Sequence, residues 1–132
     1  MSDAMRVVLE IGPKGKRMVA GATDWPGLDR WGRDEDEALG KLQSYRARYA
    51  PVAERAGLAD AFAREDRFDV VERYPGNTST DWWGIAHVPS ELERSPLPPD
   101  DMERRLVLVN ACWEYFDDVS KRVSAELRLG AR

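Results

Sequence analysis

Residues 18–49, MVAGATDWPGLDRWGRDEDEALGKLQSYRARY, carry most of the information about how this chain folds. They open with a predicted strand, 18–23, whose small side chains allow another backbone to approach closely. A tight turn follows, because Pro26 fixes its own φ and Gly27 permits a positive φ. Residues 28–33 are then long enough for one short strand.

An amphipathic helix is predicted directly after these strands. Asp34 is a favourable N-cap, and Glu37 three residues later completes the pattern of a capping box. The helix is expected to run to residue 49, and Pro51 is expected to stop it or to open the next helix. Its predicted apolar stripe consists of Ala38, Leu42, Tyr45 and Tyr49.

The residues before this stretch predict another strand. Apolar side chains alternate with others from Met5 to Ile11, which is the period of a strand with one buried face. The Gly- and Pro-containing residues 12–16 supply a loop. Residues 5–23 are therefore predicted to form a β-hairpin.

Downstream of the helix the predicted elements are shorter. They are a helix at 52–56 ended by Gly57, a partly helical segment at 58–65, a strand at 68–74, a further strand at 82–88 and a proline-rich loop at 89–101. In the first of these strands Phe68, Val70 and Tyr74 are expected to share one face.

The end of the chain has the strongest helical periodicity. Eight residues recur at alternating steps of four and three, and seven of them are apolar, as in a heptad seam. The helix from Met102 to Leu127 would be about 38 Å long, whereas a strand of five or six residues spans only about 17–20 Å. A small sheet cannot cover such a seam, so part of it must pack on something more. The seam consists of Met102, Leu106, Val109, Trp113, Phe116, Ser120, Val123 and Leu127.

These elements predict an α+β fold: a small, mostly antiparallel sheet with a packed helix, followed by a long C-terminal helix. The expected divisions are a sheet domain at 1–76, a strand and proline-rich linker at 77–101, and an amphipathic helix at 102–129.

Composition limits the possible functions. The chain has 132 residues, 42% hydrophobic and 33% charged, with a net charge of −4. Such a balance is ordinary for one globular domain, and the negative charge does not favour direct binding to nucleic acid. Cys112 is the single cysteine, and neither a signal peptide nor a membrane span is recognisable. We therefore expect a cytoplasmic protein without a membrane partner.

The first half of the chain resembles the HicB-type antitoxin domain. The resemblance rests on the hairpin 5–23, the Pro26-Gly27 turn, Gly32 before the helix cap, and the helix start Glu37-Ala38-Leu39. It implies a β-β-β-α-β core, part of an RNase H-like fold, with residues 68–74 as the fourth strand. Members typically continue into a ribbon-helix-helix or helix-turn-helix DNA reader, and neither is found here.

The segment 103–126, ERRLVLVNACWEYFDDVSKRVSAE, resembles an opening helix of a DinB-type four-helix bundle. Members of that family commonly bind a metal through three His residues. This chain has only one histidine, His87, so the metal-dependent activity of that family is not inferred for it. The rival hypothesis is that the chain is the front portion of such a metal-dependent enzyme and lacks its remaining His ligands.

No catalytic, cofactor or metal residues are predicted. His87 has no recognisable partner ligands, and Cys112 lies on the apolar flank of a helix, where a thiol is ordinarily unreactive. The acidic run 34–37 is explained by helix capping, because adjacent helix positions point in different directions. A nuclease would need further strand carboxylates, and Glu10 and Glu72 are the only glutamates that the predicted strands offer.

The function predicted from these observations is a non-enzymatic protein-interaction module that forms oligomers or binds a basic protein. Large aromatics at the turn either seal the core or anchor a partner, since Trp is enriched at interface hot spots. The basic hairpin at 14–17 is read as a solvated loop, and no small-molecule substrate or cofactor is inferred. The candidate partner-binding residues are Trp25, Leu28, Trp31, Leu106, Val109, Trp113 and Phe116.

Overall fold

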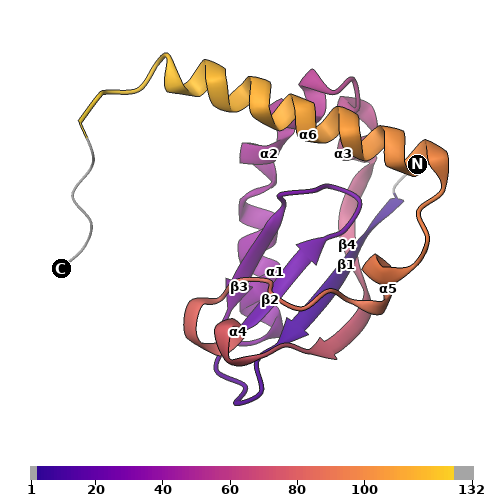
Figure 1. Cartoon of the computed structure of the whole chain (residues 1–132), viewed down its shortest axis with the longest axis vertical. Helices are drawn as coiled ribbons and strands as arrows, with labels where there is room; N and C mark the ends of the chain where they lie inside the picture. Colours follow the sequence, from indigo (N-terminus) through magenta and orange to yellow (C-terminus); the bar gives the residue numbers. More distant parts are fainter. Residues whose placement is uncertain (1–2, 127–132) are drawn as a thin grey trace.

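A computed structural model describes residues 3–126 and shows an α+β fold within them (Figure 1). The sheet has four strands in the order β3-β2-β1-β4. Both neighbours of β2 run antiparallel to it, whereas β4 lies parallel to β1. The strands are β1 (Asp3–Ile11), β2 (Met18–Ala22), β3 (Asp29–Gly32) and β4 (Glu65–Pro75).

The predicted hairpin and the short third strand are confirmed. In the hairpin, Glu10 of β1 is paired with Val19 of β2, and in the next pair Val19 faces Trp31 of β3. The turn between β2 and β3 contains Gly27 at φ 94°. Residues 3–126 thus contain the expected β-β-β-α-β order.

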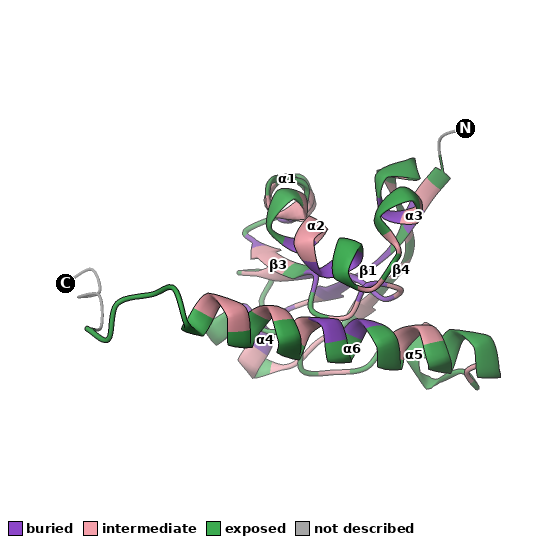
Figure 2. Ribbon diagram, turned by 90° about the horizontal axis from the view of Figure 1, so that it is seen from above, coloured by how far each residue is buried: buried purple, intermediate pink, exposed green. Residues whose placement is uncertain are grey.

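Three helices cover one face of the sheet, and Figure 2 shows them on the same side of it. They are α1 (Glu35–Ser44), α2 (Arg46–Arg55) and α3 (Ala59–Arg64). The opposite face is crossed by the chain that contains α4 (Thr78–Trp83) and α5 (Glu91–Arg94), and α6 (Pro99–Ser120) crosses the end of the sheet. The core between the layers includes Met5, Val7, Leu9, Trp25, Leu42, Phe62 and Leu108.

The prediction of a single helix up to residue 49 is wrong, because the helix is interrupted at Tyr45. This residue ends α1 and precedes α2, with φ −92° and ψ −2°. Pro51 lies inside α2 and not at a helix boundary. A proline there removes one backbone hydrogen bond, and burial of Tyr49, Val52 and Ala53 in the same helix offsets that loss.

The prediction that Phe68, Val70 and Tyr74 share a face is also wrong. The register of β4 shifts against β1, with Val70 opposite Val7 and Glu72 opposite Val8. Val71 is therefore an extra residue, which reverses the alternation of side chains along the strand. Phe68 and Val70 pack on the helix-covered core, whereas Tyr74 reaches Glu10 on the other face.

Residues 82–88 do not form the predicted strand. Trp82 and Trp83 end the helix α4, which begins with a capping box at Asn77 and ends at Gly84 in the left-handed conformation. The proline-rich segment that follows contains α5 and the first residues of α6. Local capping therefore overrides the apolar run that indicated a strand.

The long C-terminal helix is confirmed, with different ends. It begins at Pro99, where a proline is favoured in the first turn. It ends at Ser120. The prediction that residues 121–126 are helical is therefore wrong. Leu127 and the remainder of the predicted helix lie outside the described residues.

Candidate protein-interaction face

One side of α6 is firmly attached to the rest of the chain. Leu108 and Ala111 are buried in the main core. Arg55 of α2 forms an ion pair with Asp118. Arg104 donates to the backbone oxygen of Asp24, and its guanidinium lies over the Trp25 ring, 4.2 Å from the centroid. The helix is thus fixed by a second apolar stripe, which includes Leu108, Cys112 and Tyr115, and not by the predicted seam.

The predicted seam faces away from the domain, and Figure 2 shows that side of α6 as exposed. Trp113 and Phe116 are 64% and 63% exposed, with their ring centroids 6.2 Å apart. Within residues 3–126, a single copy therefore leaves the apolar residues of the seam from Met102 to Val123 exposed, as the length argument predicted. We call this surface the α6 face; it consists of Met102, Leu106, Val109, Trp113 and Phe116, all exposed.

Acidic side chains border the α6 face. Helical spacing places Glu103, Glu114 and Asp117 along one edge of the apolar stripe, and all three residues are exposed. Among the ion pairs of residues 3–126, none involves these carboxylates. The opposite edge turns toward the domain, where Arg105 lies 3.7 Å from Asp24. The solvent-facing border is therefore negative.

The aromatic turn has a different role from the α6 face. Trp25 and Leu28 are buried, and the Trp25 ring makes edge contacts with Tyr49 and Phe62 at centroid distances of 6.2 and 4.9 Å. These two residues seal the core, so the partner-binding prediction does not extend to them. Trp31 is half-buried, with the cations of Arg17 and Lys41 within 4.6 and 3.9 Å of its ring.

A cluster of arginines around Asp24 joins the sheet, the turn and α6. Arg6 binds its carboxylate through two nitrogens, at 2.9 and 2.7 Å. Burial alone would raise the pKa of the Asp24 carboxyl, but the Arg6 bond and the charges of Arg104 and Arg105 outweigh that effect and lower it. The ionised form of Asp24 is therefore stabilised by folding.

Replacing Asp24 with asparagine is expected to lower the free energy of unfolding at neutral pH by about 1–2 kcal/mol. Because the pKa is depressed in the folded state, this contribution is present above the unfolded value near 3.8 and is lost as the pH falls through the folded value. Urea unfolding of both proteins between about pH 7 and pH 3 should show the difference shrinking in acid. Asp69→Asn, at an exposed strand position, is the control; an equally large loss there would contradict a specific role for Asp24.

A buried carboxylate on the other face of the sheet was not recognised in the sequence. Glu10 is 1% exposed and accepts hydrogen bonds from Thr80 Oγ1 at 2.7 Å and from the backbone N–H of Val88 at 2.7 Å. The N–H of His87 and the hydroxyl of Tyr74 also donate to it. Burial and the nearby Glu10 charge raise the pKa of the Tyr74 hydroxyl. Glu10 thereby ties the segment after α4 to the sheet, and we call this carboxylate with its four donors the Glu10 clamp.

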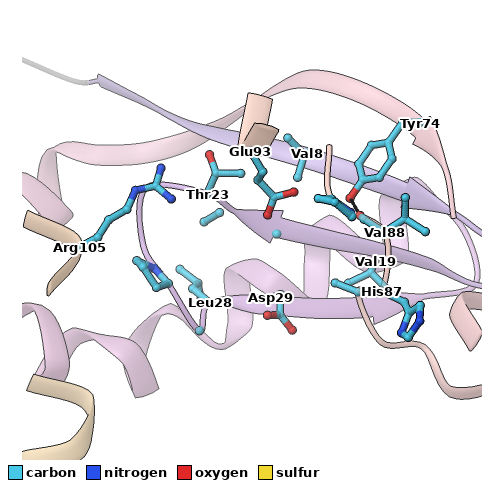
Figure 3. Close-up of a pocket in the computed structure, with 16 residues that line it drawn as sticks. Val8, Val19, Thr23, Leu28, Asp29, Tyr74, His87, Val88, Glu93 and Arg105 are labelled. Atoms are coloured by element: carbon cyan, nitrogen blue, oxygen red, sulfur yellow. Dashed lines mark hydrogen bonds between the residues drawn. The ribbon is translucent and has the colours of Figure 1, made fainter. Parts of the chain in front are cut away.

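Beside this clamp lies a cavity of about 370 Å³ between the sheet and residues 86–93 (Figure 3). Gly21 lines it, and the side chain of Glu93 projects over β2. Desolvation raises the pKa of the Asp29 carboxyl in its wall. The side chains of His87 and Arg105 lie at opposite ends of the cavity in Figure 3, so its ionisable groups do not converge on one point.

The remaining chemical candidates have structural roles. Cys112 is half-buried, and burial raises the pKa of its thiol, which disfavours the reactive thiolate. In the acidic run 34–37, the Asp34 side chain accepts from the Glu37 N–H at 2.8 Å, while Glu35 pairs with Arg73. Within residues 3–126, no three His, Cys, Asp or Glu side chains are grouped so that they could hold a metal ion.

Comparisons with known proteins do not assign the site. No protein-family model matches the chain, and neither the curated proteins nor the solved structures contain a match. None of the helices in residues 3–126 is both long and apolar enough to traverse a bilayer. The function is therefore inferred from the surfaces of the chain itself.

Proposed function

We propose that this chain is a non-enzymatic protein-interaction module of the HicB antitoxin type, which binds a basic protein through the α6 face. The single observation that carries this proposal is the exposure of five large apolar side chains on one side of a helix that is fixed by its other side. Burying a side chain of this size contributes about 1.5–3 kcal/mol. Contiguous apolar surface of this kind is typical of a protein-binding site.

The acidic border favours a partner with positive charge. In a heptad seam the flanking positions set partner choice and orientation. With Leu106 and Phe116 in the seam, Glu103 and Asp117 occupy one flank. An antiparallel pair of α6 helices would bring Glu103 of one copy to Asp117 of the other, and a parallel pair would place Asp117 beside Cys112. Neither arrangement forms an ion pair, whereas Lys or Arg flanks would.

The HicB part of the proposal is supported by the order of elements that the resemblance implies. The hairpin, the turn at Pro26 and the helix after Asp34 are present, and β4 completes the order beside β1. The helix α6 is then the interaction element attached to that core. A basic partner protein, bound without chemical change, fits a surface with apolar residues in its centre and carboxylates at its edge.

A designed peptide can take the place of the basic partner in a binding experiment. The probe is an amphipathic helix of about 21 residues, three heptads long, with leucine in the seam and lysine on both flanks. Isothermal titration should show that the full chain binds this peptide, and that the same peptide with glutamate flanks binds at least about tenfold more weakly. Leu106→Asp and Trp113→Asp should each abolish binding.

Val71→Asp is the matched control, because Val71 is another exposed apolar residue and lies on β4, away from α6. It should leave binding unchanged, and circular dichroism should show that all variants are folded. Equal binding of the lysine and glutamate peptides would contradict the charge argument. Unchanged binding by the Leu106→Asp and Trp113→Asp proteins would contradict the proposed face.

A further inference from the structure

A second apolar cluster is exposed at the other end of the molecule. Trp82 and Trp83 are 68% and 67% exposed, and their ring centroids lie 6.4 Å apart. Ile85, just after α4, is half exposed. We call these three residues the tryptophan patch. Tryptophan is enriched among the residues that contribute most of the binding energy at the centres of interfaces.

Cations border the tryptophan patch because the β1–β2 hairpin is tied to α4. The Asp81 carboxylate accepts hydrogen bonds from the backbone N–H groups of Lys14 and Lys16 at 2.7 and 2.9 Å. Arg17 donates to the backbone oxygens of Asp81 and Trp82. The ion pairs of residues 3–126 include neither lysine. Asp81 offsets one charge and leaves the border positive.

The two exposed surfaces are complementary. The α6 face is apolar with carboxylates at its edge, whereas the tryptophan patch is apolar with lysines and an arginine beside it. In Figure 1 α6 lies at one end of the longest axis, and the hairpin and α4 lie at the other. The two surfaces therefore cannot meet within one copy, but they can meet between two.

We propose that the α6 face of one copy docks on the tryptophan patch of a second copy. This inference rests on the proposed function and identifies the positively charged partner surface as the tryptophan patch of another molecule of the same chain. It also uses the hairpin cations, which a direct α6–α6 contact would leave out.

Such a contact is heterologous, because two different surfaces of the same chain meet. A row of copies keeps one free surface at each of its two ends, so assembly continues unless the rotation closes a ring. The α6 face and the tryptophan patch are both small, which places the contact between them in the weak, transient class of interfaces. The average mass should therefore rise with concentration, and added salt should lower it.

Two complementary variants test this arrangement. The face variant carries Leu106→Asp and Trp113→Asp and keeps the patch; the patch variant carries Trp82→Ser and Trp83→Ser and keeps the face. Sedimentation velocity over about 10–500 µM should show growing mass for the wild type and monomers for each variant alone, with association weakened more than about tenfold. An equimolar mixture of the two variants should form 1:1 pairs that do not grow further.

The control Val71→Asp should assemble like the wild type, and each variant should unfold cooperatively in urea. A patch variant that still assembles would show that α6 faces pair with each other, which overturns this inference but leaves the proposed function in place. A wild type that stays monomeric throughout would also overturn it. Binding of monomers to oligothymidine or to phosphatidylserine vesicles through Trp82 and Trp83 would likewise overturn this inference. Failure of the lysine peptide to bind would instead overturn the proposed function.

Discussion

Replacing Glu10 with alanine is expected to lower the free energy of unfolding by about 2–4 kcal/mol. The Glu10 carboxylate is buried and accepts from Thr80 Oγ1 and from the backbone N–H groups of His87 and Val88. Alanine would leave these donors without an acceptor in a site that is largely shielded from water. A buried donor that loses its partner retains its desolvation cost, which is the physical reason for the large effect.

Equilibrium urea unfolding measures this loss, and amide hydrogen exchange locates it. Exchange at Val88 should accelerate in Glu10→Ala, because its N–H bond to Glu10 at 2.7 Å is gone. Glu10→Gln keeps one acceptor oxygen and should lose about half as much. Glu72→Gln is the matched control, since Glu72 also accepts two backbone N–H groups but at a more exposed site. Equal losses for Glu10→Ala and Glu72→Gln would contradict the burial argument.

Gly32→Ala is expected to destabilise the chain by about 3 kcal/mol. A Cβ atom at this position would lie 2.3 Å from the backbone nitrogen of Ala38 and 2.8 Å from its Cα. These are backbone atoms of α1, so no side-chain rotation relieves the clash. The strand β3 and the helix α1 would have to move apart, which would loosen the core around Ala38 and Leu42.

Gly40→Ala in the same helix is the matched control. A Cβ atom there meets nothing within 4 Å, and alanine in a helix interior is favoured over glycine by about 0.5–1 kcal/mol. Urea unfolding should therefore show opposite signs for the two substitutions. If Gly32→Ala were as stable as the wild type, the close contact between β3 and α1 would not be a feature of the fold.

Elements that depend on neighbouring residues could be predicted from the sequence. The turn at Pro26-Gly27 and the start of α1 at Asp34 each follow from residues adjacent in the chain, whose chemistry acts at short range. The break at Tyr45 could not be predicted in this way. The Arg30 guanidinium lies over the Tyr45 ring, 3.8 Å from its centroid. That contact joins the end of α1 to β3, which comes earlier in the chain.

The candidate face was predicted in part. Heptad periodicity indicated the exposed seam, and the mismatch between helix length and strand length indicated that it would be uncovered. The sequence could not show that the stripe of α6 containing Leu108 packs on the core, because that packing depends on distant residues such as Arg55 and Trp25. The tryptophan patch was missed because adjacent tryptophans before Gly84 resembled a strand. The role of Glu10 was missed because its hydrogen-bond partners are 64–78 residues away.

The extra residue at Val71 lets one strand serve two different interiors. Up to Val70, β4 supplies side chains to the helix-covered core, and after Val71 it supplies Tyr74 to the Glu10 clamp. The side chain of Val71 is itself exposed. This position acts as a spacer, so evolution can vary its chemistry freely while the number of residues in the strand must stay the same.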